Sequence, residues 1–310
     1  MRRMLLAVGL AVCVCTAHAE RGAGKYRAHK STHKRVHVSY PAPSEPAVYL
    51  GRDASPLDLH LRSAAVLVVD QNDGHPLLAR NIETVAPIAS ITKLMTAMVA
   101  LDSGAALDEV ITISSAEIDT LKGTRSRLHV GVALPRRDLI HLALMASENR
   151  AAAALARAHP QGSSAFIAAM NRKALELGMS RTRFVDSTGL NSDNVSTAGD
   201  LVKMVTAAYR YPLIREFTTM SGHEVAPVGG GRSLAFRNSN GLVKNKSWEI
   251  GLSKTGYISE AGRCLVMQAQ IAAKPVIIVL LDSWGKYTRL ADANRIKRWM
   301  ESALARRPLS

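Results

Sequence analysis

Three consecutive strand-like segments near the C-terminal end most strongly constrain how this chain can fold. EIGLSKTGYI, RCLVMQAQI and KPVIIVLLDS are rich in apolar and β-branched residues and are joined by short polar turns. Short connections favour antiparallel pairing, because parallel neighbours need a long crossover. A further segment, SAAVLVVDQNDGHPLLARN, lies far earlier in the chain and predicts two strands around an Asp73-Gly74 turn. One sheet with strands from both ends of the domain is the economical arrangement.

The residues between these strand regions have mainly helical periodicity. From Asp108 to Tyr211, apolar residues recur at spacings of three and four, as in RRDLIHLALMASENRAAAALARA. Gly178 stands where a glycine commonly ends a helix. A last segment, 291–306, predicts a helix packed on the sheet, because its apolar residues share one face. That face comprises Ile296, Trp299, Met300, Ala303 and Leu304. The predicted fold class is α/β (α+β): an antiparallel sheet flanked by helices, with an inserted, mostly helical region.

Residues 1–19 have the organisation of a secretory signal peptide. Arg2 and Arg3 precede an apolar run, and Ala17-His18-Ala19 matches a small-x-small cleavage site. The apolar run, Met4 to Cys15, is too short to span a bilayer. We therefore expect cleavage after Ala19 and export to the periplasm.

Residues 20–58 have the composition of a basic, Pro-rich linker, which leaves 59–310 for the folded domain. The formal charge of the chain is +15, and much of the excess lies between residues 20 and 40. The basic residues of this arm are Arg21, Lys25, Arg27, Lys30, Lys34 and Arg35. Such an arm favours an anionic surface or polymer. In an exported protein nucleic acid is a poor partner, so we expect peripheral contact with an anionic envelope surface.

Two other features have simple interpretations. His29, His33 and His37 recur every four residues and could bind a metal if this segment were helical. The neighbouring glycines and the dense positive charge instead favour a disordered arm, and we expect no metal site.

Cys264 is the one cysteine left after cleavage, so no internal disulfide is expected. Its strand-like setting favours a buried thiol over a nucleophile.

Ser90 and Lys93 are three residues apart in the apolar stretch VAPIASITKLMTAMVALDSG. Residues i and i+3 of a helix share a face, so the amine can point at the hydroxyl. A serine hydroxyl is a weak nucleophile and needs an adjacent base. A lysine can serve if burial or a second cation lowers its pKa from about 10.4. The apolar surroundings thus predict a lysine that acts as a base.

An S-x-x-K pattern alone is weak, because Ser31 to Lys34 also matches it. Lys254-Thr255-Gly256 adds a K-T-G pattern in a strand-like segment. An S-x-N pattern has two candidates, Ser147-Glu148-Asn149 between helical segments and Ser192-Asp193-Asn194 in a polar loop. We choose the first, because the motif should lie between packed helices, and interpret the second as a turn before a helix. Together, S-x-x-K, S-x-N and K-T-G mark penicillin-binding proteins and class A β-lactamases.

With these motifs the chain resembles the serine D-Ala-D-Ala peptidases, the low-molecular-mass penicillin-binding proteins. The resemblance is strongest to the D-alanyl-D-alanine endopeptidase type, penicillin-binding protein 7/8. It rests on PIASITKLMTAMVALD, LALMASENRAAAALA, LGMSRTRFVDSTGL and SKTGYISEAGRCLVM, and it extends from about residue 60 to the C-terminus. It implies a β-lactamase/penicillin-binding-protein-like transpeptidase fold and no cofactor.

The resemblance also implies how the motif residues act. Ser90 would be the acyl-accepting nucleophile, Lys93 its general base, and Ser147 a proton relay to the leaving amine. Backbone N–H groups of Ser90 and Tyr257 would form the oxyanion hole.

Substrate binding is implied for the other motif residues. Asn149 would hold Lys93 and an amide carbonyl of the substrate, while Lys254 and Thr255 would bind a substrate carboxylate. Gly256 would let the substrate strand lie close to the backbone. We also expect Lys254 to be the second cation that lowers the pKa of Lys93.

The implied reaction is hydrolysis of D-Ala-containing cross-links of peptidoglycan through an acyl-enzyme on Ser90. Cross-linked muropeptides would be substrates, and β-lactam antibiotics covalent inhibitors. A D-alanyl-D-alanine carboxypeptidase is the nearest alternative, although the short segment after Gly256 leaves no room for the extra domain of related carboxypeptidases. A class A β-lactamase needs a deacylating glutamate, and none lies in a matching loop. A non-catalytic wall-binding module would have little reason to keep Ser90, Lys93 and Lys254 together.

Overall fold

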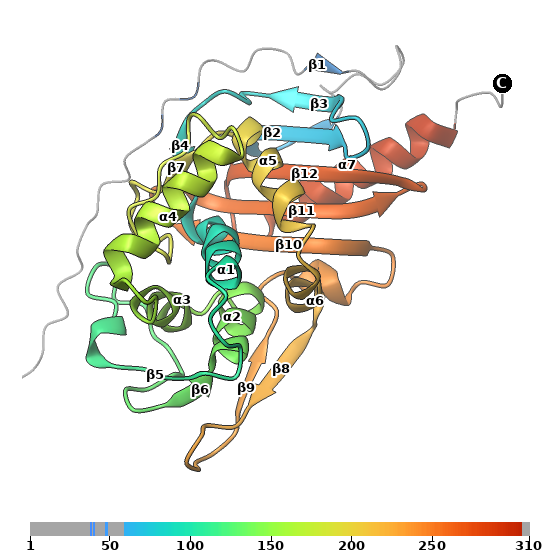
Figure 1. The fold of residues 1–310 in the computed structure, drawn as a ribbon. Coiled ribbons are helices and arrows are strands. Elements are labelled where there is room, and N and C mark those ends of the chain that lie inside the picture. Colours follow the sequence, from blue (N-terminus) through green and yellow to red (C-terminus); the bar gives the residue numbers. More distant parts are fainter. Residues whose placement is uncertain (1–37, 39, 41–46, 49–58, 306–310) are drawn as a thin grey trace, which may run out of the picture. The chain divides into compact units, whose positions relative to one another are not determined.

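The computed structural model describes residues 38, 40, 47–48 and 59–305 (Figure 1). Its main sheet has six strands in the order β1-β3-β2-β12-β11-β10, and every neighbouring pair is antiparallel. These strands are β1 (Ala47–Val48), β3 (Pro76–Arg80), β2 (Ser63–Asp70), β12 (Lys274–Ser283), β11 (Gly262–Ile271) and β10 (Glu249–Ile258). The prediction of an antiparallel sheet built from both ends of the domain is confirmed.

Strand β2 shows why its sequence is a continuous apolar run. Val66 and Val68 belong to the apolar cluster on one face of the sheet, whereas Leu67 and Val69 belong to the cluster on the other. A strand covered on both faces needs apolar residues at successive positions rather than at alternate ones. The predicted turn after β2 is present, and Gly74 has a φ of 73° there, which a glycine adopts without strain.

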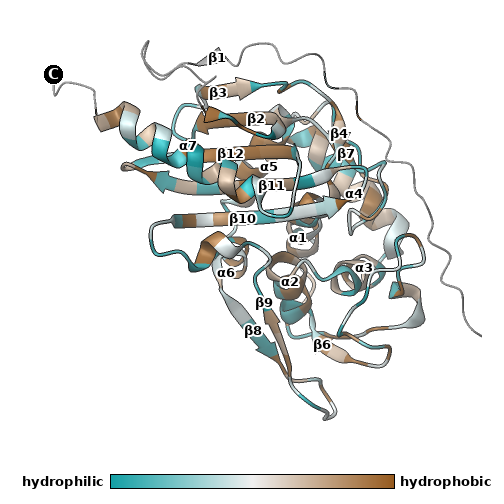
Figure 2. Ribbon diagram, turned by 180° about the vertical axis from the view of Figure 1, so that it is seen from behind, coloured by the Kyte–Doolittle hydropathy of each residue, from teal (hydrophilic) through white to brown (hydrophobic). Residues whose placement is uncertain are grey.

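Helix α7 (Thr288–Ala305) covers one face of the sheet, as Figure 2 shows from behind. Ile296 and Met300 are fully buried against the sheet, and Trp299 and Leu304 pack partly against the same cluster. The predicted apolar face of this helix is therefore confirmed.

On the other face, α5 (Ala198–Ala208) packs against β2, β11 and β12, and much of the remaining helical region between β3 and β10 extends past the edge strand β10 (Figure 1). The other helices of this region are α1 (Lys93–Asp102), α2 (Arg136–Met145), α3 (Asn149–Arg157), α4 (Gly162–Glu176) and α6 (Pro212–Thr219). Helix α4 ends where Gly178 predicts, with a φ of 70° at that glycine. Three short antiparallel pairs interrupt this region and were not predicted. They are β4 (Ala86–Pro87) with β7 (Val195–Ser196), β5 (Val110–Thr112) with β6 (Ala133–Pro135), and β8 (Gly222–Val225) with β9 (Leu234–Arg237).

Several sequence predictions fall wholly or partly outside the described residues. The predicted signal peptide, the basic residues of the arm and the three histidines all lie there. Of the predicted linker, Ala47 and Val48 are described, and they pair with Leu78 and Ala79 of β3. Within the described part of the chain, no side-chain group is arranged to hold a metal ion and no helix is long and apolar enough to cross a bilayer. Cys264 is a buried free thiol, as expected, and burial raises its pKa to about 11.

Candidate active site

Ser90 lies in a short 3-10 helix, η2 (Ala89–Thr92), immediately before α1 begins at Lys93. Because a 3-10 helix has three residues per turn, Ser90 and Lys93 stack on one side of it. The Thr92 hydroxyl donates to Ala89 O at 2.8 Å, and Ala89 has a φ of 48°, which is unfavourable for alanine. The predicted juxtaposition of Ser90 and Lys93 is thus reached through a tight turn rather than within the longer helix.

The Lys93 amine is fully buried and has three oxygen neighbours. Its Nζ lies 2.8 Å from Ser90 Oγ, 2.7 Å from Asn149 Oδ1 and 2.5 Å from Thr188 O. Burial lowers the pKa of Lys93 to about 7, against the opposing influence of the Asp186 and Glu148 carboxylates.

This surrounding fits a neutral amine. A neutral amine has two N–H donors and one lone pair. The amide oxygen of Asn149 and the carbonyl of Thr188 can only accept hydrogen bonds, so they take the two donors. The lone pair is then left for the Ser90 hydroxyl, which is the arrangement a general base requires.

Ser147 and Asn149 occupy the sharp turn between α2 and α3. Ser147 has a φ of 61°, and the Glu148 side chain caps α3 by accepting from Arg150 N. Asn149 begins α3, accepts from Lys93 and donates through Nδ2 to Thr124 Oγ1 at 3.0 Å. This turn therefore places the chosen S-x-N motif beside Ser90 and Lys93.

In the alternative S-x-N motif, Asn194 stabilises the local structure. Asn194 is fully buried, and its Oδ1 accepts from Val185 N and Asp186 N. Its Nδ2 donates to Thr92 Oγ1 at 3.1 Å, within the turn that carries the candidate nucleophile. Asn194 thus holds a loop against that turn and makes no hydrogen bond to Lys93.

Lys254 and Thr255 lie in the buried middle of β10. Lys254 Nζ donates to Ser147 Oγ at 2.8 Å and to Thr255 O at 2.9 Å, while Thr255 Oγ1 donates to Ser239 Oγ at 2.7 Å. Burial lowers the pKa of Lys254 well below its usual value, and the Lys93 and Arg289 cations lower it further. Burial is the main cause of the lowered pKa of Lys93. Because repulsion between two cations is mutual, a contribution of Lys254 to that shift stays a prediction.

Gly256 is in close contact with the turn that carries Ser90. A Cβ at this position would lie 2.9 Å from Ile88 O and 3.2 Å from Ser90 N. A side chain at this position would therefore collide with the turn of Ser90, whereas the role expected for Gly256 toward a substrate strand stays a prediction. The Arg289 guanidinium donates to Gly256 O at 3.0 Å and fixes the strand from its other side. Tyr257 follows and is 55% exposed.

Sequence reasoning missed the loop that supplies Thr188. The Asp186 carboxylate folds this loop by accepting from the backbone N–H groups of Thr188, Gly189 and Asn191. Gly189 has a φ of 78°, and a Cβ there would lie 2.0 Å from Ala89 O. The D-S-T-G run at 186–189 offered a turn signal, but a backbone carbonyl that contacts a distant lysine leaves no residue-type signature.

A deacylating base of the class A β-lactamase kind would require a glutamate carboxylate beside Ser90 or Lys93. Among the described residues between Asn149 and Lys254, no glutamate hydrogen-bonds to Ser90 or Lys93, and Glu216 instead pairs with Arg137 at 3.0 Å. Glu148 lies close enough to influence Lys93, but its carboxylate caps α3. The site therefore lacks a positioned glutamate base of the class A kind in this part of the chain.

Comparisons with known proteins agree with this geometry. The sequence model of a family described as D-alanyl-D-alanine carboxypeptidase matches residues 52–285. The chain is 51% identical over 247 residues to a D-alanyl-D-alanine endopeptidase of Pseudomonas aeruginosa, with 80% of each chain covered. It is 46% identical to a D-alanyl-D-alanine endopeptidase of Escherichia coli, with 78% of each chain covered. The crystal structure of the Streptomyces K15 DD-transpeptidase is similar with a TM-score of 0.73 and 29% identity, covering 78% of this chain and 98% of that one.

Proposed function

The chain belongs to the D-alanyl-D-alanine carboxypeptidase family of serine hydrolases, and we propose that its main reaction is endopeptidic. In this proposal it is a serine D,D-endopeptidase that hydrolyses D-Ala-containing cross-links of peptidoglycan. Relatives at 51% and 46% identity are named endopeptidases, whereas a Streptomyces K15 relative at 32% identity is named a carboxypeptidase. These names support the endopeptidic preference. The observation that carries the serine-hydrolase chemistry is the buried Lys93 amine, 2.8 Å from Ser90 Oγ and otherwise surrounded by acceptors.

Acylation begins when neutral Lys93 takes the proton from Ser90 Oγ, which attacks the D-Ala carbonyl carbon. An ester forms between Ser90 and D-Ala, and the scissile C–N bond breaks. The departing amine needs a proton, and Ser147 passes one on from Lys254, with which it shares a 2.8 Å hydrogen bond. Lys93 then returns its proton to Lys254 by way of Ser147 and is neutral again. Water attacks the ester, Lys93 accepts the proton of that water and passes it to Ser90 Oγ as the ester bond breaks, and D-Ala is released with a free carboxyl group that ionises.

Lys254 and Thr255 recognise the carboxylate beside the scissile amide. Lys254 is almost fully buried and lies near a second potential cation, Lys93, so its protonated form is unstable in the empty site. An arriving carboxylate stabilises that form, which ties proton uptake to substrate binding. The N–H groups of Ser90 and Tyr257 belong to the two segments that meet at Gly256, and they stabilise the oxyanion.

β-Lactams acylate the same serine and inhibit the enzyme. Peptidoglycan, and no nucleic acid, is the macromolecular partner. We assign residues 1–19 to a signal peptide cleaved after Ala19, which directs the protein to the periplasm. The basic residues of the arm then contact an anionic envelope surface through charge attraction.

Ser90→Ala tests the proposal directly. The variant should lose both labelling by a fluorescent penicillin and hydrolysis of cross-linked muropeptides, because it lacks the hydroxyl that forms the ester. Ser192→Ala is the matched control, since Ser192 begins the alternative S-x-N motif and should be dispensable. Labelling of Ser90→Ala at the wild-type rate would refute the assignment of the nucleophile.

A further inference from the structure

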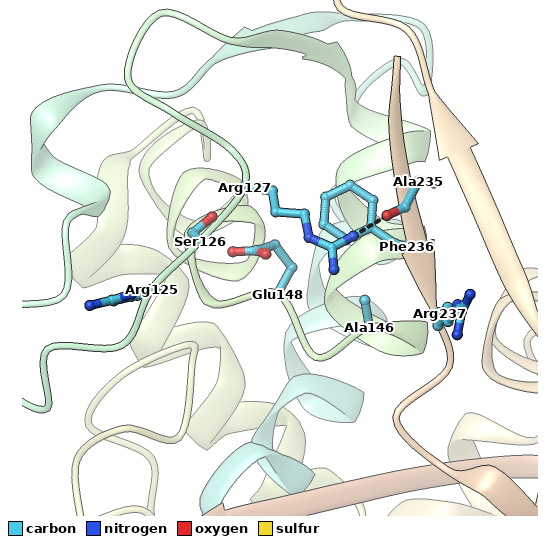
Figure 3. Close-up of a pocket in the computed structure, with 8 residues that line it drawn as sticks. All are labelled: Arg125, Ser126, Arg127, Ala146, Glu148, Ala235, Phe236 and Arg237. Atoms are coloured by element: carbon cyan, nitrogen blue, oxygen red, sulfur yellow. Dashed lines mark hydrogen bonds between the residues drawn. The ribbon is translucent and has the colours of Figure 1, made fainter. Parts of the chain in front are cut away.

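A pocket of about 660 Å³ lies beside the second motif, and we call it the arginine pocket (Figure 3). Three segments supply its lining: the loop between β5 and β6, the turn between α2 and α3, and strand β9. The lining residues are Arg125, Ser126, Arg127, Ala146, Glu148, Ala235, Phe236 and Arg237. Its volume falls in the range of pockets that hold small ligands.

The charge of the arginine pocket is predominantly positive. Three arginines and one glutamate line it, and in the described part of the chain none of the four forms an ion pair. Arg125 and Arg237 are exposed, and they flank the pocket on either side of Arg127 in Figure 3. Uncompensated guanidinium groups around a concave surface attract carboxylates, which they bind through paired N–H donors.

Arg127 is held in place by its surroundings. Its Nη1 donates to Ala235 O, and its guanidinium lies 5.4 Å from the centre of the Phe236 ring. These contacts engage one donor and one face of the group. The remaining N–H donors stay available at a position the protein has already ordered, which lowers the entropic cost of binding an anion.

The walls of the arginine pocket are tied to the catalytic motifs. Arg125 follows Thr124, whose hydroxyl accepts from Asn149 Nδ2 at 3.0 Å. Ala146 and Glu148 are the chain neighbours of Ser147. Strand β9 leads into Ser239, which accepts from Thr255 Oγ1 at 2.7 Å. The pocket therefore adjoins the second motif directly and connects to the third through one hydrogen bond.

We propose that the arginine pocket is a subsite for a free carboxylate on a peptide arm of the cross-linked substrate, an inference that rests on the proposed function. A cross-linked dimer has two peptide arms, and it carries free carboxylates besides the one next to the scissile amide. A small penicillin has no such arm. The pocket thus selects for large, anionic, branched substrates, whereas Ser90, Lys93 and Lys254 perform the chemistry.

The test uses the double variant Arg125→Glu/Arg237→Glu in the full-length mature protein. Neither side chain makes a hydrogen bond among the described residues, so the fold should tolerate the change. We expect kcat/KM for a purified cross-linked dimer to fall at least about tenfold, mainly through KM, because charge-assisted hydrogen bonds are lost. The rate of acylation by a fluorescent penicillin should stay within about twofold of wild type.

Two controls sharpen this test. Arg172→Glu/Arg298→Glu makes the same change in net charge on α4 and α7, away from the pocket, and should cleave the dimer normally. A synthetic dimer whose only free carboxylate is the one beside the scissile amide should be cleaved equally by wild type and the pocket variant.

The outcomes separate the two claims. Dimer cleavage by the pocket variant at the wild-type rate overturns the subsite. Equal losses in the pocket and control variants also overturn it, because they reveal a general charge effect. Failure of the wild-type protein to acylate with penicillin overturns the proposed function, and the subsite with it.

Discussion

Lys93 shows how a single buried residue acquires its chemistry. The side chain is fully buried in an apolar core. Its amine contacts two oxygens that can only accept hydrogen bonds, Asn149 Oδ1 and Thr188 O, and one hydroxyl that can accept or donate, that of Ser90. Burial disfavours the charged form and brings its pKa to about 7. A lysine on the surface would stay protonated at neutral pH and could not accept the proton of Ser90.

The pH dependence of acylation follows from this shift. In the proposed mechanism Lys93 acts in its neutral form. At saturating β-lactam, whose carboxylate keeps Lys254 protonated, the acylation rate should therefore rise about tenfold per pH unit below 7 and level off above it. Stopped-flow measurement with a chromogenic β-lactam between pH 5 and 9 checks this, with circular dichroism to verify that the protein stays folded. A rate independent of pH between 5.5 and 8 would exclude Lys93 as the base.

At the scale of elements, the active site depends on the close approach of β10 to the turn of Ser90. Gly256 allows this approach on one side of the turn, and Gly189 allows another loop to approach Ala89. The geometry of the nucleophile is thus set by contacts among three segments that are distant in sequence.

Gly256→Ala should disturb this contact. The new methyl group would lie 2.9 Å from Ile88 O, and the strand must shift or the turn must open. We expect penicillin acylation to fall about 100-fold, since small displacements of reacting groups are costly, and the free energy of unfolding to fall by about 1–3 kcal/mol.

Gly199→Ala is the matched control for that substitution. Gly199 lies in the first turn of α5, where the nearest heavy atom to an added Cβ is 3.8 Å away. The Gly199→Ala variant should react with penicillin at the normal rate. It should be slightly more stable to unfolding than the wild-type protein, because alanine has a higher helix propensity than glycine. Normal acylation by Gly256→Ala would contradict the importance of the close approach.

Pattern length decided which elements the sequence could predict. Strands β10, β11 and β12 have ten residues each, long enough for their apolar content to identify them. The pairs β4–β7 and β5–β6 have two or three residues per strand, too few to produce a period. The motif residues could be picked out from the sequence pattern alone. The hydrogen bonds that Thr188 O accepts from Lys93 and Ser239 Oγ accepts from Thr255 could not, because they join segments that only the tertiary fold brings together.

At the scale of the whole molecule, the sheet joins the two ends of the domain. The Asp292 carboxylate of α7 accepts from Arg62 N, Ser63 N and Ser63 Oγ at the start of β2. This buried network ties the last helix to the first long strand. The proposed catalytic residues lie in the chain between these two elements, so this network anchors both ends of the segment that carries them.

The basic arm should act independently of this catalytic machinery. Replacement of its six Lys and Arg residues between Arg21 and Arg35 by Gln removes part of the +15 formal charge. We expect weaker retention on purified cell-wall sacculi at low salt, because long-range charge attraction is lost, with unchanged penicillin acylation. Equal retention of the two proteins at every salt concentration would argue against a role for the arm in binding.

The proposed preference of this serine peptidase is for cross-links over free chain ends. The most direct measurement follows a purified cross-linked muropeptide dimer and a pentapeptide monomer by mass spectrometry, each incubated with the mature protein and with Ser90→Ala. We predict that the wild-type protein splits the dimer while the pentapeptide mostly survives, and that Ser90→Ala does neither. Loss of the terminal D-Ala from the pentapeptide faster than the dimer opens would contradict the claim and identify a carboxypeptidase.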